Sequence, residues 1–224
     1  MGWSLNFEML DKPIRVFGMT SFVIQSRTVF AKLIQNLYQY TEETKELKLF
    51  DDDYKQLKKD ELLVLTDMLG YDINSVSVLK LLYKDLEQQI SLEPEIKMEI
   101  EDAINMAMNL INKEFLHFEL DLESDKVEIN SFFKAMNMRI HVESSTIFER
   151  ALDILRVFKY LAKKKLLVFV NLSTYLSRSE VEALAEQVEL LNISVLMLDN
   201  APFEAKINQI IMDEDYVLLP NIMV

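Results

Sequence analysis

In the first third of the chain, hydrophobic residues recur at the spacing of strands in several segments and at the spacing of a helix in one. Apolar and polar residues alternate in "SLNFEML" (4–10), which is typical of a half-buried strand. Gly18 separates "IRVF" from "TSFVIQ", and this punctuation predicts a hairpin. The uninterrupted apolar run "ELLVLTD" (61–67) predicts a buried strand that ends at Asp67. Between these strands, "SRTVFAKLIQNLYQY" predicts a helix with one apolar face, made of Val29, Leu33, Leu37 and Tyr40.

The middle of the chain has helical periodicity almost throughout. The stretch 74–90 predicts one helix, for which Asn74 or Ser75 supplies the N-cap. A longer helix follows over 93–120, with Pro94 well placed in its first turn. We expect the two helices to form an antiparallel pair, with a third, short helix in "INSFFKAM". The apolar positions of the longer helix recur at helical intervals, at Ile96, Ile100, Ile104, Ile111, Phe115 and Phe118.

The last third returns to alternating strands and helices. Thr146 and Glu149 have the spacing of a capping box, which predicts a helix that runs to about residue 163. The segments "LLVFV" and "ISVLMLD" are continuously apolar, as strands covered on both faces are. The helix between them has a capping box of its own, at Ser177 and Glu180. A strand, a helix and a strand at this spacing predict a βαβ unit with parallel strands.

These patterns together predict an α/β fold with a helical insertion. We expect residues 1–72 and 142–224 to form one discontinuous α/β head domain, and residues 73–141 to form a helical domain inserted into it. Only three glycines and four prolines occur among 224 residues, which favours long regular elements with few elaborate loops.

Composition narrows the class of protein. The chain has no cysteine, which excludes disulfides and thiolate metal sites and suits a reducing cytoplasm. Its first residues lack the pattern of a signal peptide, and no stretch of roughly 18 apolar residues predicts a membrane span. We therefore expect a cytoplasmic protein that does not contact a membrane. The formal net charge of −13 is a weak argument against nucleic acid, because binding depends on the local field.

Positive charge is concentrated in one stretch in spite of this negative average. Residues 156–165 include no acid and contain Arg156, Lys159, Lys163, Lys164 and Lys165. The first three are spaced by three and four, so they share a helix face. Such a face is usually just solvated, and the alternative is a phosphate-binding surface. Duplex binding would need more positive charge, from other subunits or from Lys126, Lys134 and Arg139.

Polar residues end three of the apolar strands, at Asp67, Asn171 and Asp199. Ligands of open α/β sheets lie beyond the carboxyl ends of strands, and "LLVLTD" looks like the acid-bearing strand that positions magnesium in P-loop NTPases. Such an enzyme also needs the glycine-rich loop G-x-x-x-x-G-K-[ST]. The strand-to-helix turn "VIQSRTVFAKL" contains no glycine. The sequence therefore favours capping roles for these polar residues and predicts no ATP hydrolysis.

Acidic residues cluster in "EFLHFELDLESDKVE" (114–128). Asp121, Glu123 and Asp125 have the spacing of the ligands that begin an EF-hand loop. Lys126 stands where that loop needs glycine, and Phe132 stands where it needs a bidentate glutamate, so the stretch is not an EF-hand. From the residues alone, a solvated acidic turn is favoured over a Ca²⁺ site. The chain's two histidines are isolated, which argues against general-base catalysis.

Five stretches in this order resemble one known family over nearly the whole length of the chain. They are "LYQYTEETKELKLFDDD", "TDMLGYDINSVSVLKLLYKDLE", "FELDLESDKVEI", "TIFERALDILRVFKYLAKKKLLVFVN" and "MDEDYVLL". The chain resembles the small accessory proteins of type II-A CRISPR adaptation, a family of rings that bind the ends of double-stranded DNA.

The resemblance implies a head that is similar to P-loop ATPases but lacks the phosphate loop, and a helical leg domain inserted into it. It implies a non-enzymatic homotetrameric ring whose positive channel encloses linear double-stranded DNA, and Ca²⁺ ions that stabilise the ring. The implied partners are the integrase proteins of CRISPR adaptation and the type II effector nuclease. The implied metal-binding residues are Glu119, Asp121, Glu123, Asp125 and Glu128. The implied DNA-facing residues are Lys126, Lys134, Arg139, Lys159, Lys163 and Lys164.

Two other functions stay open on the sequence. A metal-dependent nuclease is favoured by the clustered carboxylates and disfavoured by the lack of a catalytic set borne on strands. An acidic interaction module would bind another protein through its helical insertion and would not bind DNA.

Overall fold

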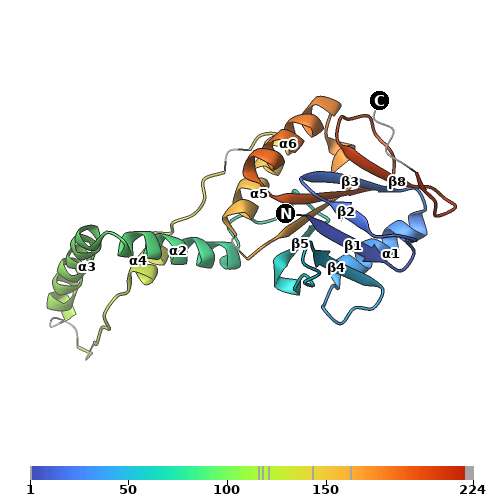
Figure 1. Ribbon diagram of the computed structural model, residues 1–224. Helices are drawn as coiled ribbons and strands as arrows, with labels where there is room; N and C mark the ends of the chain where they lie inside the picture. The colour runs from blue at the N-terminus through green and yellow to red at the C-terminus, as the bar shows by residue number, and fades with distance from the viewer. Residues whose placement is uncertain are drawn as a thin grey trace. The chain divides into compact units, whose positions relative to one another are not determined.

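The computed structural model describes residues 2–115, 117, 119–120, 122–142, 144–161 and 163–219. The chain divides into two compact units, which Figure 1 shows: a head unit of residues 1–71 and 142–224, and an insertion of residues 72–141. This division lies within one residue of the boundaries expected from the sequence. None of the described helices combines the length and the apolar composition needed to cross a bilayer.

A six-stranded sheet forms the centre of the head unit, and its neighbouring strands are parallel except for the last pair. In spatial order the strands are β5 (Leu62–Leu65), β6 (Leu166–Val170), β7 (Ser194–Asp199), β3 (Met19–Ile24), β8 (Asn208–Met212) and β9 (Leu218–Leu219). The helix α6 (Arg178–Leu191) connects β6 to its neighbour β7, so the predicted parallel βαβ unit is confirmed. Both predicted capping boxes are formed, at the starts of α5 (Ile147–Tyr160) and α6.

The hairpin predicted around Gly18 is wrong. The strand β2 (Ile14–Val16) pairs antiparallel with β1 (Trp3–Phe7), which also pairs with β4 (Leu47–Asp51) in a separate three-stranded sheet. The strand after Gly18, β3, belongs to the six-stranded sheet instead. Gly18 has a φ of 51°, a left-handed conformation that glycine adopts at little cost, and there the chain passes from one sheet to the other.

The main core lies between the two sheets. The small sheet and α1 (Arg27–Tyr38) pack their apolar side chains against one face of the large sheet. The four residues predicted to share an apolar face are at most 1 % exposed: Val29, Leu33, Leu37 and Tyr40. On the opposite face of the large sheet lie α5 and α6 (Figure 1). Short 3-10 helices precede β5 and follow β6, at η1 (Lys59–Glu61) and η2 (Leu172–Tyr175).

In the insertion, the short helix α4 (Ile129–Ala135) packs against α2 (Val76–Ser91). Their contact centres on the rings of Tyr83 and Phe133, whose centroids are 5.9 Å apart. The Tyr83 hydroxyl donates to the carbonyl oxygen of Met138 at 2.5 Å, which fastens the chain after α4 to α2. Together with α3 (Pro94–Phe115), these helices account for the three predicted in the insertion, within its described residues.

Of the two residues predicted as alternatives for the N-cap of α2, Asn74 does not occupy that position. Its side-chain amide exchanges two hydrogen bonds with the backbone of Ile140, at 2.8 and 3.0 Å. These bonds join the two ends of the insertion to each other. Ser75 stands at the N-cap position, and its side chain makes no capping hydrogen bond.

The helix α3 (Pro94–Phe115) begins at Pro94 as predicted but does not fold back along α2. Figure 1 shows that it turns away, so the predicted antiparallel pair is wrong. Side chains of α4 pack against α2, and Ile100 in the first part of α3 joins the same cluster. Among the described residues of α3 only Ile104 is buried, and several large apolar side chains of the helix are exposed: Ile96, Met98, Met106, Leu110 and Ile111. Phe118, assigned to the same face on the sequence, lies outside the described residues.

Two turns of the head unit have the same hydrogen-bonding pattern. They are the segments 51–55, "DDDYK", and 213–217, "DEDYV", which begin with Asp51 and Asp213. In each turn the aspartate carboxylate accepts two backbone N–H bonds, at 2.8 and 3.0 Å. The N–H of the tyrosine donates to the carbonyl oxygen of the same aspartate. As a result Tyr54 and Tyr216 adopt positive φ values, 60° and 66°, which are costly for a residue with a side chain.

Candidate nucleic-acid interface

Two of the predicted DNA-facing residues stand at the end of α5. Lys159 lies in the last turn of this helix and Lys163 follows its end, and both are exposed. Within the described residues, the side chain of neither lysine forms a hydrogen bond or an ion pair. Arg156, one turn earlier, is 3.2 Å from the Asp153 carboxylate. The negative end of the helix dipole favours cations at this position, so the two lysines form a positive surface that is open to an external anion.

The next two lysines are engaged within the head unit. The ammonium group of Lys164 donates to the carbonyl oxygen of Leu62 at 2.6 Å, and burial lowers its pKa. Lys165 forms an ion pair with Glu61 at 2.7 Å, with both side chains mostly buried. These contacts join the starts of β5 and β6. Lys164 therefore has a structural contact that its predicted DNA-facing role did not include.

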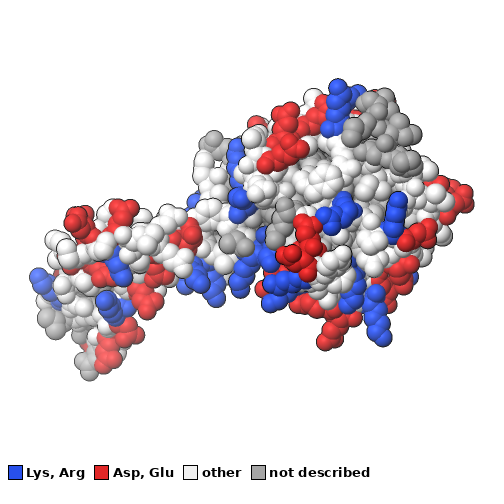
Figure 2. Space-filling model, viewed as in Figure 1, with Lys and Arg blue, Asp and Glu red and all other residues white. Residues whose placement is uncertain are grey.

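The other predicted DNA-facing residues lie in the insertion and are exposed. Lys134 is in the last turn of α4, while Lys126 precedes this helix and Arg139 follows it. The sequence analysis did not single out Lys80 and Lys84, which are exposed one turn apart on α2. Their i, i+4 spacing was the available signal. On the visible face of the insertion, acidic side chains are spread among the basic ones, so that face is not continuously positive (Figure 2).

Four of the five predicted metal-binding residues are described, and these four are not grouped as a metal site. Glu119, Glu123, Asp125 and Glu128 are exposed on backbone that is neither helix nor strand, and Asp121 lies outside the described residues. In the described part of the chain, no three carboxylate or imidazole side chains are grouped so that they could hold a metal ion. Among the described residues, the predicted ligands therefore form no coordination shell of the kind that Ca²⁺ takes.

One predicted ligand, Glu128, lines a small cavity of about 220 Å³ in the insertion. The same cavity is lined by Glu87, Glu101, Lys97 and Lys126, so positive charge already accompanies the carboxylates. The Asn130 amide donates to Glu87, and its Oδ1 atom is buried without a partner among the described residues.

Two of the three polar residues at the strand ends, Asp67 and Asp199, accept local hydrogen bonds as the sequence favoured, whereas the side chain of Asn171 makes no capping bond. Asp67 accepts the Gly70 N–H at 2.9 Å, and Asn171 adopts a left-handed conformation at the start of η2. Asp199 accepts both the N–H and the hydroxyl of Ser173. Asp199 is only 1 % exposed, burial raises its pKa, and its Oδ2 atom has no partner among the described residues.

The glycine-free turn between β3 and α1 also departs from a phosphate-binding loop. Ser26 stands at the N-cap of α1 without a side-chain capping bond. The N–H of Gln25 is already bonded to the carbonyl oxygen of Met212 at 3.0 Å. This turn therefore lacks the glycine-rich backbone that P-loops use to surround a phosphate chain.

Comparison with known proteins decides which family this fold represents. The model of the CRISPR-associated protein family Cas_Csn2 matches residues 38–216. The chain belongs to the Csn2 family. The resemblance to the accessory proteins of type II-A CRISPR adaptation is thereby confirmed.

Two relatives and one solved structure are similar over almost the whole Csn2-family chain. CRISPR-associated protein Csn2 of Enterococcus faecalis is 43 % identical over 214 residues, which are 96 % of this chain and 97 % of that protein. CRISPR-associated protein Csn2 of Streptococcus agalactiae is 41 % identical over 220 residues, 98 % of this chain and 99 % of that protein. The crystal structure of Stu0660 of Streptococcus thermophilus shares the fold, with a TM-score of 0.61 and 14 % identity over 95 % of this chain and 74 % of that one.

Proposed function

We propose that this Csn2-family protein is a non-enzymatic scaffold that binds the ends of linear double-stranded DNA during CRISPR spacer acquisition. The observation that supports this most is a pair of exposed lysines, Lys159 and Lys163, that pair with no described residue in a chain of net charge −13. Ammonium groups on a helix end suit phosphates, which carry no sequence information. Binding is therefore independent of DNA sequence.

The proposal includes a homotetrameric ring, because one chain offers few phosphate contacts. Four copies of the lysine pair around one channel would surround a duplex while the outer surface stays acidic and soluble. The exposed apolar side chains of α3 support self-association, since exposed apolar surface is typical of protein–protein contacts. The ring needs at least one such contact between subunits.

The proposal also includes Ca²⁺ as the ion that orders the acidic segment 119–128. Its carboxylates repel one another at neutral pH, and a divalent cation cancels that repulsion. Ca²⁺ accepts six to eight oxygen ligands in flexible geometry, which suits an irregular segment better than the strict octahedron of Mg²⁺. The residues proposed to hold it are Glu119, Asp121, Glu123, Asp125 and Glu128.

The proposed partners are the integrase proteins of CRISPR adaptation and the type II effector nuclease, in the cytoplasm. The glycine-free turn after β3 supports the non-enzymatic part of the proposal.

A mobility-shift titration tests this function. A labelled linear duplex of about 30 base pairs is titrated with protein in CaCl₂ and in EDTA, and parallel samples contain Mg²⁺ or Mn²⁺. We expect a shifted, intact duplex that is bound more tightly with Ca²⁺. Cleaved DNA would support the nuclease instead, and the absence of a shift at low salt would support an interaction module that does not bind DNA.

A further inference from the structure

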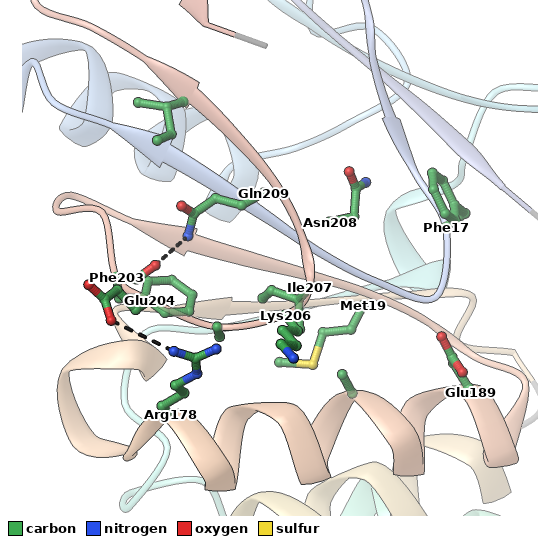
Figure 3. A pocket seen from close by; sticks show the side chains of 13 residues that line it. Phe17, Met19, Arg178, Glu189, Phe203, Glu204, Lys206, Ile207, Asn208 and Gln209 are labelled. Carbon is green, nitrogen blue, oxygen red and sulfur yellow. Dashed lines mark hydrogen bonds and ion pairs between the residues drawn. The ribbon is translucent and has the colours of Figure 1, made fainter. Parts of the chain in front are cut away.

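A cavity of about 720 Å³ lies in the head unit, between α6, β8 and the crossover segment 203–207 that leads into β8. Figure 3 shows it from close by. None of the residues proposed above for DNA or Ca²⁺ lines it. Its volume falls within the range of roughly 300–1,000 Å³ that is typical of small-molecule sites.

Hydrogen bonds fix the walls of this cavity in place. The N–H of Lys206 donates to the Glu182 carboxylate at 2.9 Å, and Arg178 donates to the same oxygen at 3.0 Å. These contacts lower the pKa of Glu182, so it remains ionised at neutral pH. The Gln209 amide donates to the carbonyl oxygen of Phe203 at 3.3 Å. The crossover segment is thus tied to both α6 and β8, and the cavity is formed before any ligand enters.

Most of the wall between these hydrogen bonds is apolar. The side chain of Met19 is 5 % exposed, and Ala185, Ile207 and Ile211 also line the cavity. Phe17 is 56 % exposed and belongs to the same lining, away from the Arg178 end in Figure 3. An aromatic ring left this open beside an apolar cavity would lose contact with water if an apolar ligand were bound.

The charges around the cavity favour one kind of polar group. Arg178 is compensated by Glu182 and by Glu204, which lies 3.7 Å away. Lys206 and Met19 both line the cavity (Figure 3), and the ammonium group of Lys206 forms no ion pair with another described residue. Glu189 stands at the opposite end from Arg178 and would repel an anion there. Among the described lining residues, Lys206 is therefore the cation without a direct ion pair, and Glu182 acts on its charge only through a Coulomb interaction beyond ion-pair distance.

We propose that this cavity binds an amphipathic organic anion, with its carboxylate paired to Lys206 and its apolar body against Met19, Ile207 and Phe17. Two sources share this chemistry, medium-chain fatty acids and aromatic carboxylic acids. The site goes beyond the DNA-binding function and does not depend on it.

Methyl NMR of protein labelled at its methionine methyl groups tests the proposal, with Met19 as the reporter. The probes are decanoate, 1-naphthoate and uncharged decanol. We expect a saturable shift of the Met19 methyl with at least one acid, and the acid that binds more tightly identifies the source. Decanol should bind more weakly than decanoate, and the exposed Met98 on α3 should not respond.

Lys206→Met keeps the apolar stem and removes the charge, so decanoate should bind roughly five- to tenfold more weakly while decanol is unaffected. Lys45→Met is the matched control, because Lys45 is exposed in the head unit and does not line the cavity. Ala185→Phe fills the cavity and should abolish both shifts. No Met19 shift with either acid, unchanged decanoate affinity in Lys206→Met, or equal shifts at Met98 would overturn the proposal.

Discussion

Replacing Lys163 by glutamine removes one exposed ammonium group from each subunit of the proposed ring and breaks no side-chain contact with another described residue. If Lys159 and Lys163 each neutralise one phosphate, four subunits make about eight contacts. The slope of log K against log[salt] is then about −7 for the unmodified protein and about −3.6 for Lys163→Gln. Between about 50 and 200 mM salt, affinity should fall about ten-thousandfold for the unmodified protein and about a hundredfold for the variant.

Fluorescence anisotropy of a labelled linear duplex across a salt series measures these slopes. The neighbouring Lys164 provides the matched control, because its ammonium group is bonded to the Leu62 carbonyl oxygen and faces the fold. Lys164→Met should leave the slope unchanged and destabilise the protein by about 1–2 kcal/mol, a decrease in Tm of about 2–8 °C. Lys163→Gln should leave the Tm unchanged. An unchanged salt slope in Lys163→Gln would refute the role of Lys163 as a DNA contact. An equally shallow slope in both variants would refute the distinction between Lys163 as a DNA contact and Lys164 as a structural residue.

Three further predictions concern the turns, the buried carboxyl group and the acidic segment. Tyr54→Gly should raise the free energy of unfolding by about 1 kcal/mol in chemical denaturation, because it relieves a positive φ at a side chain that is 88 % exposed. Tyr216→Gly should gain less stability, since the half-buried Tyr216 ring loses contacts. A loss of stability in Tyr54→Gly would contradict the reasoning. Burial raises the pKa of Asp199, so as the pH falls the folded state binds a proton before the unfolded state does. The contribution of Asp199 to the free energy of unfolding therefore increases as the pH falls from the raised pKa to the pKa of the unfolded chain, about 4. Asp199→Asn should therefore be more stable than the unmodified protein at pH 7, by a margin that narrows in acid; a margin independent of pH would count against this. Ca²⁺ should raise the Tm and the oligomer mass, and Glu123→Ala with Asp125→Ala should reduce both effects; a full calcium response in the double variant would exclude this pair of ligands.

The elements that the sequence predicted correctly depend on neighbours along the chain. The capping boxes of α5 and α6 and the apolar runs of β6 and β7 are local signals, and the βαβ unit follows from their order. Gly18 was misread because a glycine between two apolar runs does not reveal which strands they will join. The strand β8 has the partly polar sequence "NQIIM" and is defined by its pairing with β3, about 190 positions earlier, so it gave no clear local signal.

The candidate site shows the same limit more sharply. Lys163 and Lys164 are adjacent residues of the same type, so the sequence does not distinguish them. They differ in the structure because the carbonyl oxygen of Leu62, 102 positions before Lys164, accepts a hydrogen bond from Lys164. The apolar cavity has walls from three separate parts of the chain, around Met19, Arg178 and Ile207, which no local pattern brings together. The positive stretch and the acidic stretch could be recognised from the sequence because each is contiguous.

Binding to linear and to covalently closed duplex tests the proposed ring most directly. A closed ring must thread onto DNA from an end, so a relaxed circle of the same length offers no entry. Competition between labelled linear duplex and unlabelled relaxed circle, in Ca²⁺ and at fixed salt, gives the two affinities. The account predicts that the circle competes at least about tenfold more weakly than the linear molecule, and that cutting the circle once restores full competition. Equal competition by the closed circle and its linear form would contradict it.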